Sequence, residues 1–253
     1  MTRSQLFQIR FAATAGVLIL AFVVVRYLWF PGDYFAISGV TKLLLVLVAV
    51  NLVVGPALST LVYKPGKWGL RFDLVVIACI ELAILGWGMH EIYERRPDFA
   101  VFSVDRFEAV TRSEVDISQL QDSRLATWPG YTPRLIYAAL PTDPEVMNQL
   151  IEDTVFLGRK DIDRRPEFWQ PYANGITKLK AAAMPLARFL TPDDSRAGPV
   201  RRWLNRRDVH AKDFVYLPMR GRDGEAIAII HADIGYPVDV LAVDPWQPFP
   251  EES

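Results

Sequence analysis

Three long apolar segments in the first 93 residues constrain this chain more than any other feature. They cover residues 11–30, 43–63 and 72–93. Each has about 20 residues, enough for an α-helix to cross roughly 30 Å of hydrocarbon. A helix satisfies its backbone hydrogen bonds internally, as a bilayer requires. We therefore predict a first domain, residues 1–96, that contains three transmembrane helices.

The first apolar segment has some features of a secretory signal peptide, because it follows the basic residues Arg3 and Arg10. It is too long for a signal-peptide core, however. It also ends in an aromatic stretch before Pro31 and not in a small-residue cleavage site. We expect the segment to be retained as a membrane anchor.

Basic residues around the segments predict how the helices are oriented. Arg3 and Arg10 precede the first helix, and Lys64, Lys67 and Arg71 lie between the second and third. Positively charged loops tend to remain in the cytoplasm, so the N-terminus is predicted to be cytoplasmic. Two arginines after the third segment favour the opposite orientation but are outnumbered. In a bacterium, this topology places the C-terminal domain in the periplasm.

Two polar side chains, Asn51 and Glu81, lie near the middle of the second and third helices. Such groups are costly in lipid unless they find a partner. One interpretation is that a protonated Glu81 bonds Asn51 and locks the helices together, since the two differ in depth by about 5 Å. Another is that Glu81 meets a polar group on a further membrane helix. A proton or ion pathway is a third, which three helices with one acid and one amide suit poorly.

Gly55 and Pro56 follow Asn51 in the second helix. Pro56 has no amide hydrogen, so the carbonyl of Leu52 loses its helical partner and the helix is expected to bend. Gly55 lies one turn from Asn51 on the same face and lets another helix approach closely. The pattern predicts a notch in the second span, next to a polar group.

Residues 97–253 have the composition of a soluble α+β domain that is large enough to bury its own core. Asp143 and Pro144 open a predicted helix to residue 157, and helical spacing continues over 174–190. A basic stretch, 199–209, is expected to be a solvated helix face. The predicted strands are 99–110 and 133–139, followed by an antiparallel β-meander of 214–218, 226–231 and 238–243.

Residues that carry chemistry are sparse. Cys79 is the only cysteine and lies within the third apolar segment, and the three histidines lack metal-ligand spacing. Phosphate-loop, dinucleotide and hydrolase motifs are absent. The acid pairs Asp161/Asp163 and Asp193/Asp194 are expected to face solvent. We therefore predict no catalytic residue, no metal, no cofactor and no enzymatic activity. The mixed charge also gives no basic face for nucleic acid.

Five short strings occur in a particular order: 55–56 (GP), 62–67 (VYKPGK), 70–73 (LRFD), 92–97 (IYERRP) and 104–108 (VDRFE). Together they resemble the TfpX/TfpZ family of type IV pilin accessory proteins, over about residues 20–110. The resemblance implies an inner-membrane accessory protein or chaperone without catalytic activity. It would bind the major type IV pilin and promote its assembly into pili, which support twitching motility.

The resemblance also implies where the pilin would bind. A type IV pilin waits in the membrane as one hydrophobic helix, with a glutamate near its start and a globular periplasmic head. The helix would dock at the polar, small and bent positions of the spans, Asn51, Gly55, Pro56 and Glu81. The head would contact residues just beyond the membrane, Asp105, Arg106, Phe107 and Glu108. Membrane lipids are the other expected partners, and the oligomeric state stays open.

Two other classes of function remain. One is a membrane-bound enzyme acting on the pilin or the cell envelope, which the absence of catalytic spacing disfavours. The other is a regulator in which Glu81 titrates, which the small number of helices disfavours.

Overall fold

The computed structural model describes residues 2–64, 68–126, 130, 132–191 and 193–249. Contacts between residues divide the chain into two compact units. The first, here called the helical unit, comprises Met1–Trp29 and Gly39–Arg96. The second, the sheet unit, comprises Phe30–Ser38 and Pro97–Ser253.

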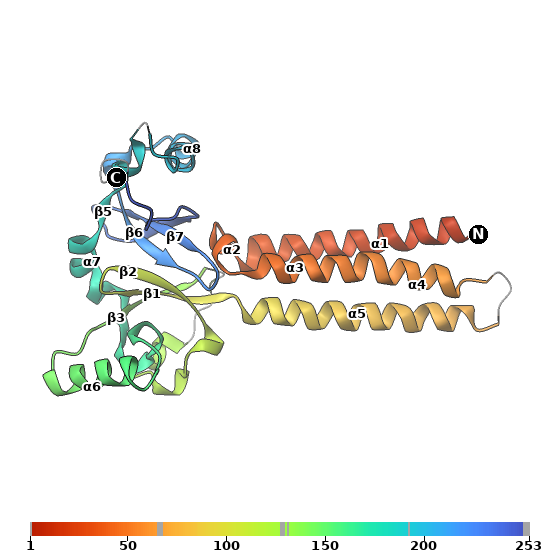
Figure 1. Cartoon of the computed structure of the whole chain (residues 1–253), viewed down its shortest axis with the longest axis horizontal. Helices are drawn as coiled ribbons and strands as arrows, with labels where there is room; N and C mark the ends of the chain where they lie inside the picture. Colours follow the sequence, from red (N-terminus) through yellow and green to blue (C-terminus); the bar gives the residue numbers. More distant parts are fainter. Residues whose placement is uncertain (1, 65–67, 127–129, 131, 192, 250–253) are drawn as a thin grey trace. The chain divides into compact units, whose positions relative to one another are not determined.

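The helical unit contains the three long helices seen in Figure 1. Each is long and apolar enough to cross a membrane, which confirms the three predicted spans and shows a membrane-protein architecture. Their elements, in chain order, are α1 (Arg3–Val23), η1 (Val24–Trp29), α3 (Val40–Ala49), η2 (Val50–Val54), α4 (Gly55–Val62) and α5 (Leu70–Glu94).

The second span is irregular where the sequence predicts it. Pro56 cannot donate a backbone hydrogen bond, and the turn directly before it, η2, is π-helical. Asn51 belongs to this wider turn and is buried, as are Gly55 and Pro56. The distortion therefore coincides with the only polar side chain that the sequence places deep in this span.

The sheet unit is built on a mixed eight-stranded sheet of order β4-β3-β1-β2-β6-β7-β8, with β5 paired to β6. The pairs β1–β3 and β2–β6 are parallel and the others are antiparallel. The strands are β1 (Pro97–Ser103), β2 (Arg106–Thr111), β3 (Arg134–Ala138), β4 (Trp169–Pro171), β5 (Met184–Pro185), β6 (Phe214–Arg220), β7 (Glu225–His231) and β8 (Pro237–Leu241).

Alternate residues of each strand point to opposite sides of the sheet. Helices cover both of these faces. One face packs against α7 (Ile176–Ala182) through Leu179. The other packs against α6 (Pro144–Val155) through Leu150 and against α8 (Ala197–Arg207) through Val200. With the antiparallel β6-β7-β8 segment, this confirms the predicted α+β class and the terminal meander.

Two predicted elements are wrong in detail. The strand expected over 99–110 is a hairpin, because the chain reverses at Val104, which has a left-handed φ of 54°. The helix expected over 174–190 ends at Ala182. Pro185 disfavours helical backbone at the residue before it and cannot donate a helical hydrogen bond, so Met184–Pro185 pairs with β6 as β5. The predicted cap of α6 is confirmed, since the Asp143 side chain accepts from the Glu145 amide.

The segment between the first two spans belongs to the sheet unit. It contains a short helix, α2 (Tyr34–Ile37), and Ile37 is 2% exposed within the sheet core. The Ile37 carbonyl accepts a 3.0 Å bond from the Asp223 amide, and Asp33 accepts a 2.8 Å bond from the Ala242 amide. These contacts make Phe30–Ser38 a structural part of the sheet unit.

Candidate functional site

The helical unit holds an ion pair between two membrane-spanning helices. Nη2 of Arg10 in α1 donates a 2.8 Å hydrogen bond to Oε2 of Glu81 in α5. Nε of Arg10 donates to Oγ of Ser59 in α4, at 3.2 Å. The two charged side chains are only 22% and 16% exposed, so one cation links all three spans in a largely shielded place.

The partner of Glu81 was not found from the sequence. Asn51, the partner in one of the three interpretations, donates to the Leu47 carbonyl of its own helix at 2.8 Å. By apolar length the first span begins at residue 11, which leaves Arg10 outside it. One sequence motif places Arg10 within the helix. The capping box of Thr2 and Gln5 starts α1 at Arg3, so Arg10 lies two turns inside it.

Gly55 lies against the carboxylate of Glu81. A β-carbon on Gly55 would fall 1.4 Å from Oε1 of Glu81 and 2.3 Å from its carboxyl carbon. Oε1 is buried and has no hydrogen-bond partner among the described residues. The predicted notch therefore exists, and a side chain from within the helical unit already fills it.

A cavity of about 160 Å³ opens beside this pair. Its polar lining comes from Arg10, Thr14, Asn51 and Glu81. The rest is apolar and comes from Ala13, Val17, Leu18, Ala78, Leu82 and Leu85. Gly55 and Pro56 are buried and do not line it. The arrangement can accept a small group that hydrogen-bonds inside an apolar surround.

The second group of predicted residues, 105–108, lies on the β1–β2 hairpin. Their side chains do not all face the same way. Asp105 is exposed at the turn, where Oδ1 lies 3.4 Å from Nε of Arg106. Phe107 is fully buried in the core with Phe102 and Tyr172. Arg106 and Glu108 project from the opposite face of β2, so only these two belong to one site.

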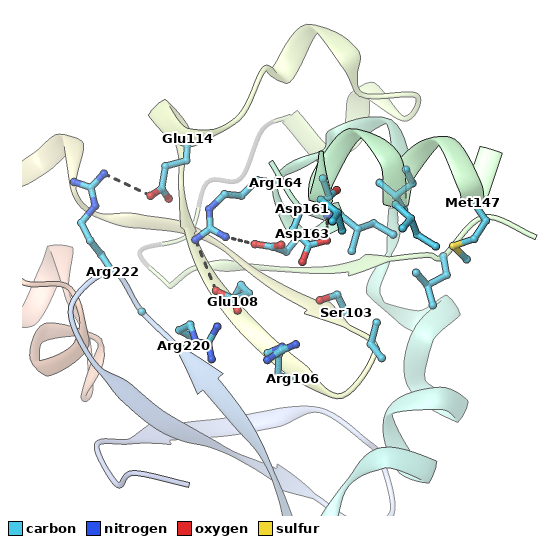
Figure 2. Close-up of a pocket in the computed structure, with 18 residues that line it drawn as sticks. Ser103, Arg106, Glu108, Glu114, Met147, Asp161, Asp163, Arg164, Arg220 and Arg222 are labelled. Carbon is cyan, nitrogen blue, oxygen red and sulfur yellow. Dashed lines mark hydrogen bonds and ion pairs between the residues drawn. The ribbon is translucent and has the colours of Figure 1, made fainter. Parts of the chain in front are cut away.

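Arg106 and Glu108 line a cavity of about 610 Å³ in the sheet unit, shown in Figure 2. Its other charged residues are Glu114, Asp161, Asp163, Arg164, Arg220 and Arg222. Its apolar side comes mainly from Leu140 and α6, with Met147, Leu150, Ile151 and Val155. One cavity thus combines a charged wall on the sheet with an apolar wall on a helix.

Glu108 lies deep in this cavity and its side chain is 8% exposed. Arg164 is the nearest cation, with Nη2 at 3.7 Å from Oε2 of Glu108. Burial and, to a smaller extent, the negative charge of Asp163 raise the pKa of Glu108 to about 7. Arg164, Arg220 and Arg106 act in the opposite direction but do not cancel the desolvation.

Two of the acids expected to face solvent are buried instead. Asp163 hydrogen-bonds the guanidinium of Arg164, and burial raises its pKa. Asp194 has a 2% exposed side chain and forms an ion pair with Arg196 at 2.8 Å. The prediction was wrong because each acid is followed, one or two residues later, by an arginine that compensates its burial. Within the described residues, no three His, Cys, Asp or Glu side chains gather as metal ligands would.

The chain is similar to proteins of Dichelobacter nodosus that are named for fimbrial assembly. It is 25% identical over 216 residues to the fimbrial assembly protein of serogroup I, covering 83% of both chains. It is 25% identical over 213 residues to the serogroup E1 protein, covering 79% of this chain and 82% of that one. The protein of serogroups C1 and C2 is 26% identical over 114 residues. No protein-family model and no solved structure matches the chain.

Proposed function

We propose that this protein is a non-enzymatic accessory of type IV pilus assembly, of the TfpX/TfpZ kind, that binds the major pilin in the inner membrane. The names of its relatives support a role in fimbrial assembly. The three apolar helices support a membrane location. The charge distribution of the sequence favours a cytoplasmic N-terminus and a periplasmic sheet unit.

The observation that carries this proposal is the Arg10–Glu81 pair and the cavity beside it. Buried charges are retained in membrane helices mainly where they serve a partner or a pathway. Glu81 keeps a buried oxygen without a hydrogen-bond partner, and Arg10 uses only part of its five N–H donors. A pilin helix that brings its own polar group to this cavity would complete the hydrogen bonding.

Hydrogen bonds alone would not hold such a helix. Bonds between membrane helices contribute only about 0.5–2 kcal/mol each. Close packing of the pilin helix on the apolar lining, together with contacts of its soluble head, must supply the remaining affinity. The proposed function therefore requires both units of the protein.

The first test is deletion of the gene combined with capture of the major pilin encoded in the same genome. Loss of surface pili with unchanged pilin synthesis is the expected result. The tagged full-length protein should co-purify with that pilin in mild detergent. Normal piliation of the deletion strain, or no capture of pilin by folded protein, would contradict the proposal. An alkaline phosphatase fused after Ser253 should be active if the sheet unit is periplasmic.

A further inference from the structure

We propose that the 610 Å³ cavity of the sheet unit binds a peptide segment of the pilin head, with an acidic side chain between Arg106 and Arg220 and an apolar side chain on α6. This inference rests on the proposed function and names the surface that would recognise the soluble part of the partner. The cavity lies entirely within the sheet unit.

The acids in the cavity are mostly engaged by the fold. Glu114 accepts a 2.9 Å bond from the Thr111 amide and faces Arg222 at 3.5 Å. Asp161 accepts a 2.7 Å bond from the Ile162 amide, and Asp163 is bonded to Arg164. These carboxylates therefore serve the local structure and are poor ligands for an incoming cation.

Arg106 and Arg220, in contrast, have only loose contacts with acids. Their nearest carboxylate oxygens, on Asp105 and Glu225, lie 3.4 and 3.9 Å from Nε. Neither of these acids lines the cavity. A guanidinium has five N–H donors in a planar fork that suits a carboxylate. Both arginines therefore keep donors for an anionic ligand.

The fold places these two guanidinium groups together. Arg220 of β6 is in register with Glu108 of β2, and Arg106 lies two residues before Glu108 on the same strand face. Figure 2 shows both arginines near Glu108, on the same side of it. Each also lies over the ring of Trp246, at 5.9 Å for Arg106 and 5.8 Å for Arg220. The pair is thus held in position before any ligand arrives.

Glu108 does not prevent an anion from binding there. It is buried beside the two arginines, in surroundings that favour its protonated form. A carboxylic acid in that form repels an anion far less than a carboxylate does and can donate a hydrogen bond to it. The local charge near the arginines is therefore positive when Glu108 carries its proton.

Helix α6 is the reason that the peptide is expected to carry an apolar side chain. Ile151 and Val155 line the cavity and are 51% and 66% exposed. Phe156 and Leu157, which follow them, are 77% and 64% exposed, so the apolar surface continues beyond the rim. A peptide with adjacent acidic and apolar side chains matches both walls, whereas a free inorganic anion would leave α6 uncovered.

The test is photo-crosslinking of the full-length protein in cells that express the major pilin of the same genome. A benzophenone amino acid is placed at Val155, or at Asn205 of α8 as an exposed control outside the cavity. A third probe at Leu82 reports on the membrane cavity. We expect a pilin adduct from Val155 and from Leu82 but not from Asn205.

Charge dependence is tested in the Val155 background. Arg106→Gln with Arg220→Gln should lower the adduct about tenfold, because two charge-assisted contacts are lost. Arg106→Lys with Arg220→Lys should keep part of it, and the matched control Arg206→Gln, at an exposed position of α8, should keep all of it. Protease resistance of the sheet unit checks that each variant folds, and if the glutamine pair does not, the lysine pair carries the comparison with Arg206→Gln.

The outcomes distinguish failure of this inference from failure of the proposed function. An undiminished adduct in both arginine pairs, or equal adducts from Val155 and Asn205, would overturn this inference. A pilin adduct from Leu82 without one from Val155 would overturn it and leave the proposed function standing. The absence of pilin adducts from all three positions would count against both.

Discussion

Gly55 of α4 lies in contact with the carboxylate of Glu81 in α5, so closely that a methyl group at residue 55 would occupy the place of Oε1. In the sequence, the two residues are separated by the rest of α4, the connection to α5 and the first half of α5. Their contact places the acidic side chain near the middle of the third span, and the Arg10 guanidinium binds its other oxygen. This relationship gives the first prediction.

Gly55→Ala should displace the Glu81 carboxylate and lower stability by about 1–3 kcal/mol, as overpacking of a tight site does. Pilin capture should fall with it. Gly86→Ala is the matched control, because a β-carbon on Gly86 of the third span meets nothing within 4 Å. Stability is measured by thermal unfolding in detergent, and equal behaviour of the two variants would show that the Gly55 contact has no energetic role.

Removing one member of the Arg10–Glu81 pair should cost more than removing both. Glu81→Leu leaves the Arg10 charge uncompensated, which costs about 3–5 kcal/mol where a pair is buried. Arg10→Leu combined with Glu81→Leu should recover much of that loss. Glu81→Gln keeps a hydrogen-bond acceptor and should be milder than Glu81→Leu.

The measurements are unfolding in detergent and pilin capture of the wild type, Arg10→Leu, Glu81→Leu, Glu81→Gln and the double variant. If the double variant is stable but captures no pilin, the pair serves binding more than structure. A loss in the double variant equal to the sum of the losses in Arg10→Leu and Glu81→Leu would contradict a direct interaction between the residues.

The stability of the sheet unit should fall as the pH rises from about 4.5 to about 7, because of Glu108. Its pKa is raised from the ordinary value of 4.5 to about 7. The folded state therefore binds a proton that the unfolded state has lost, and the penalty develops between about pH 4.5 and 7. At higher pH the difference reaches about 3 kcal/mol, at 1.36 kcal/mol per unit.

Glu108→Gln is the matched comparison, since glutamine has a similar shape and does not titrate. Unfolding of both proteins between pH 5 and 8 should show that the variant becomes relatively more stable as the pH rises. Asp163, Arg164, Arg220 and Arg106, which act on Glu108, are unchanged in both proteins. Parallel pH profiles would contradict the assignment.

Arg196→Ala should detach the last described segment of the chain. The Arg196 guanidinium binds Asp194 at 2.8 Å and donates to the carbonyls of Asp244 and Gln247, at 3.0 and 2.8 Å. The loss should be about 3–5 kcal/mol, because Asp194 stays buried without its partner. Lysine cannot form the planar fork, so Arg196→Lys should restore little. Thermal unfolding and proteolysis near residue 245 measure the effect.

Local sequence pattern was sufficient to predict the elements whose stability comes from residues close together in the chain. The apolar length of the three spans, the Asp143 cap of α6 and the alternation in β6, β7 and β8 are all visible within short windows of sequence. The same reasoning failed over 174–190, where helical spacing was correct but one proline ended the helix early. The sequence also did not predict that Asp163 and Asp194 are buried. The arginines compensate these acids only when the folded chain brings the side chains into contact.

The sites depend on residues that are far apart in the sequence. Arg10 and Glu81 are 71 positions apart, and the parallel pairing that puts Glu108 beside Arg220 joins strands more than 100 residues apart. The sequence by itself determined that the chain has three apolar spans and an α+β domain, because hydrophobic length and periodicity are local properties. Only the tertiary structure decided which charges meet and that Phe30–Ser38 joins the sheet unit, because those contacts form when distant segments pack.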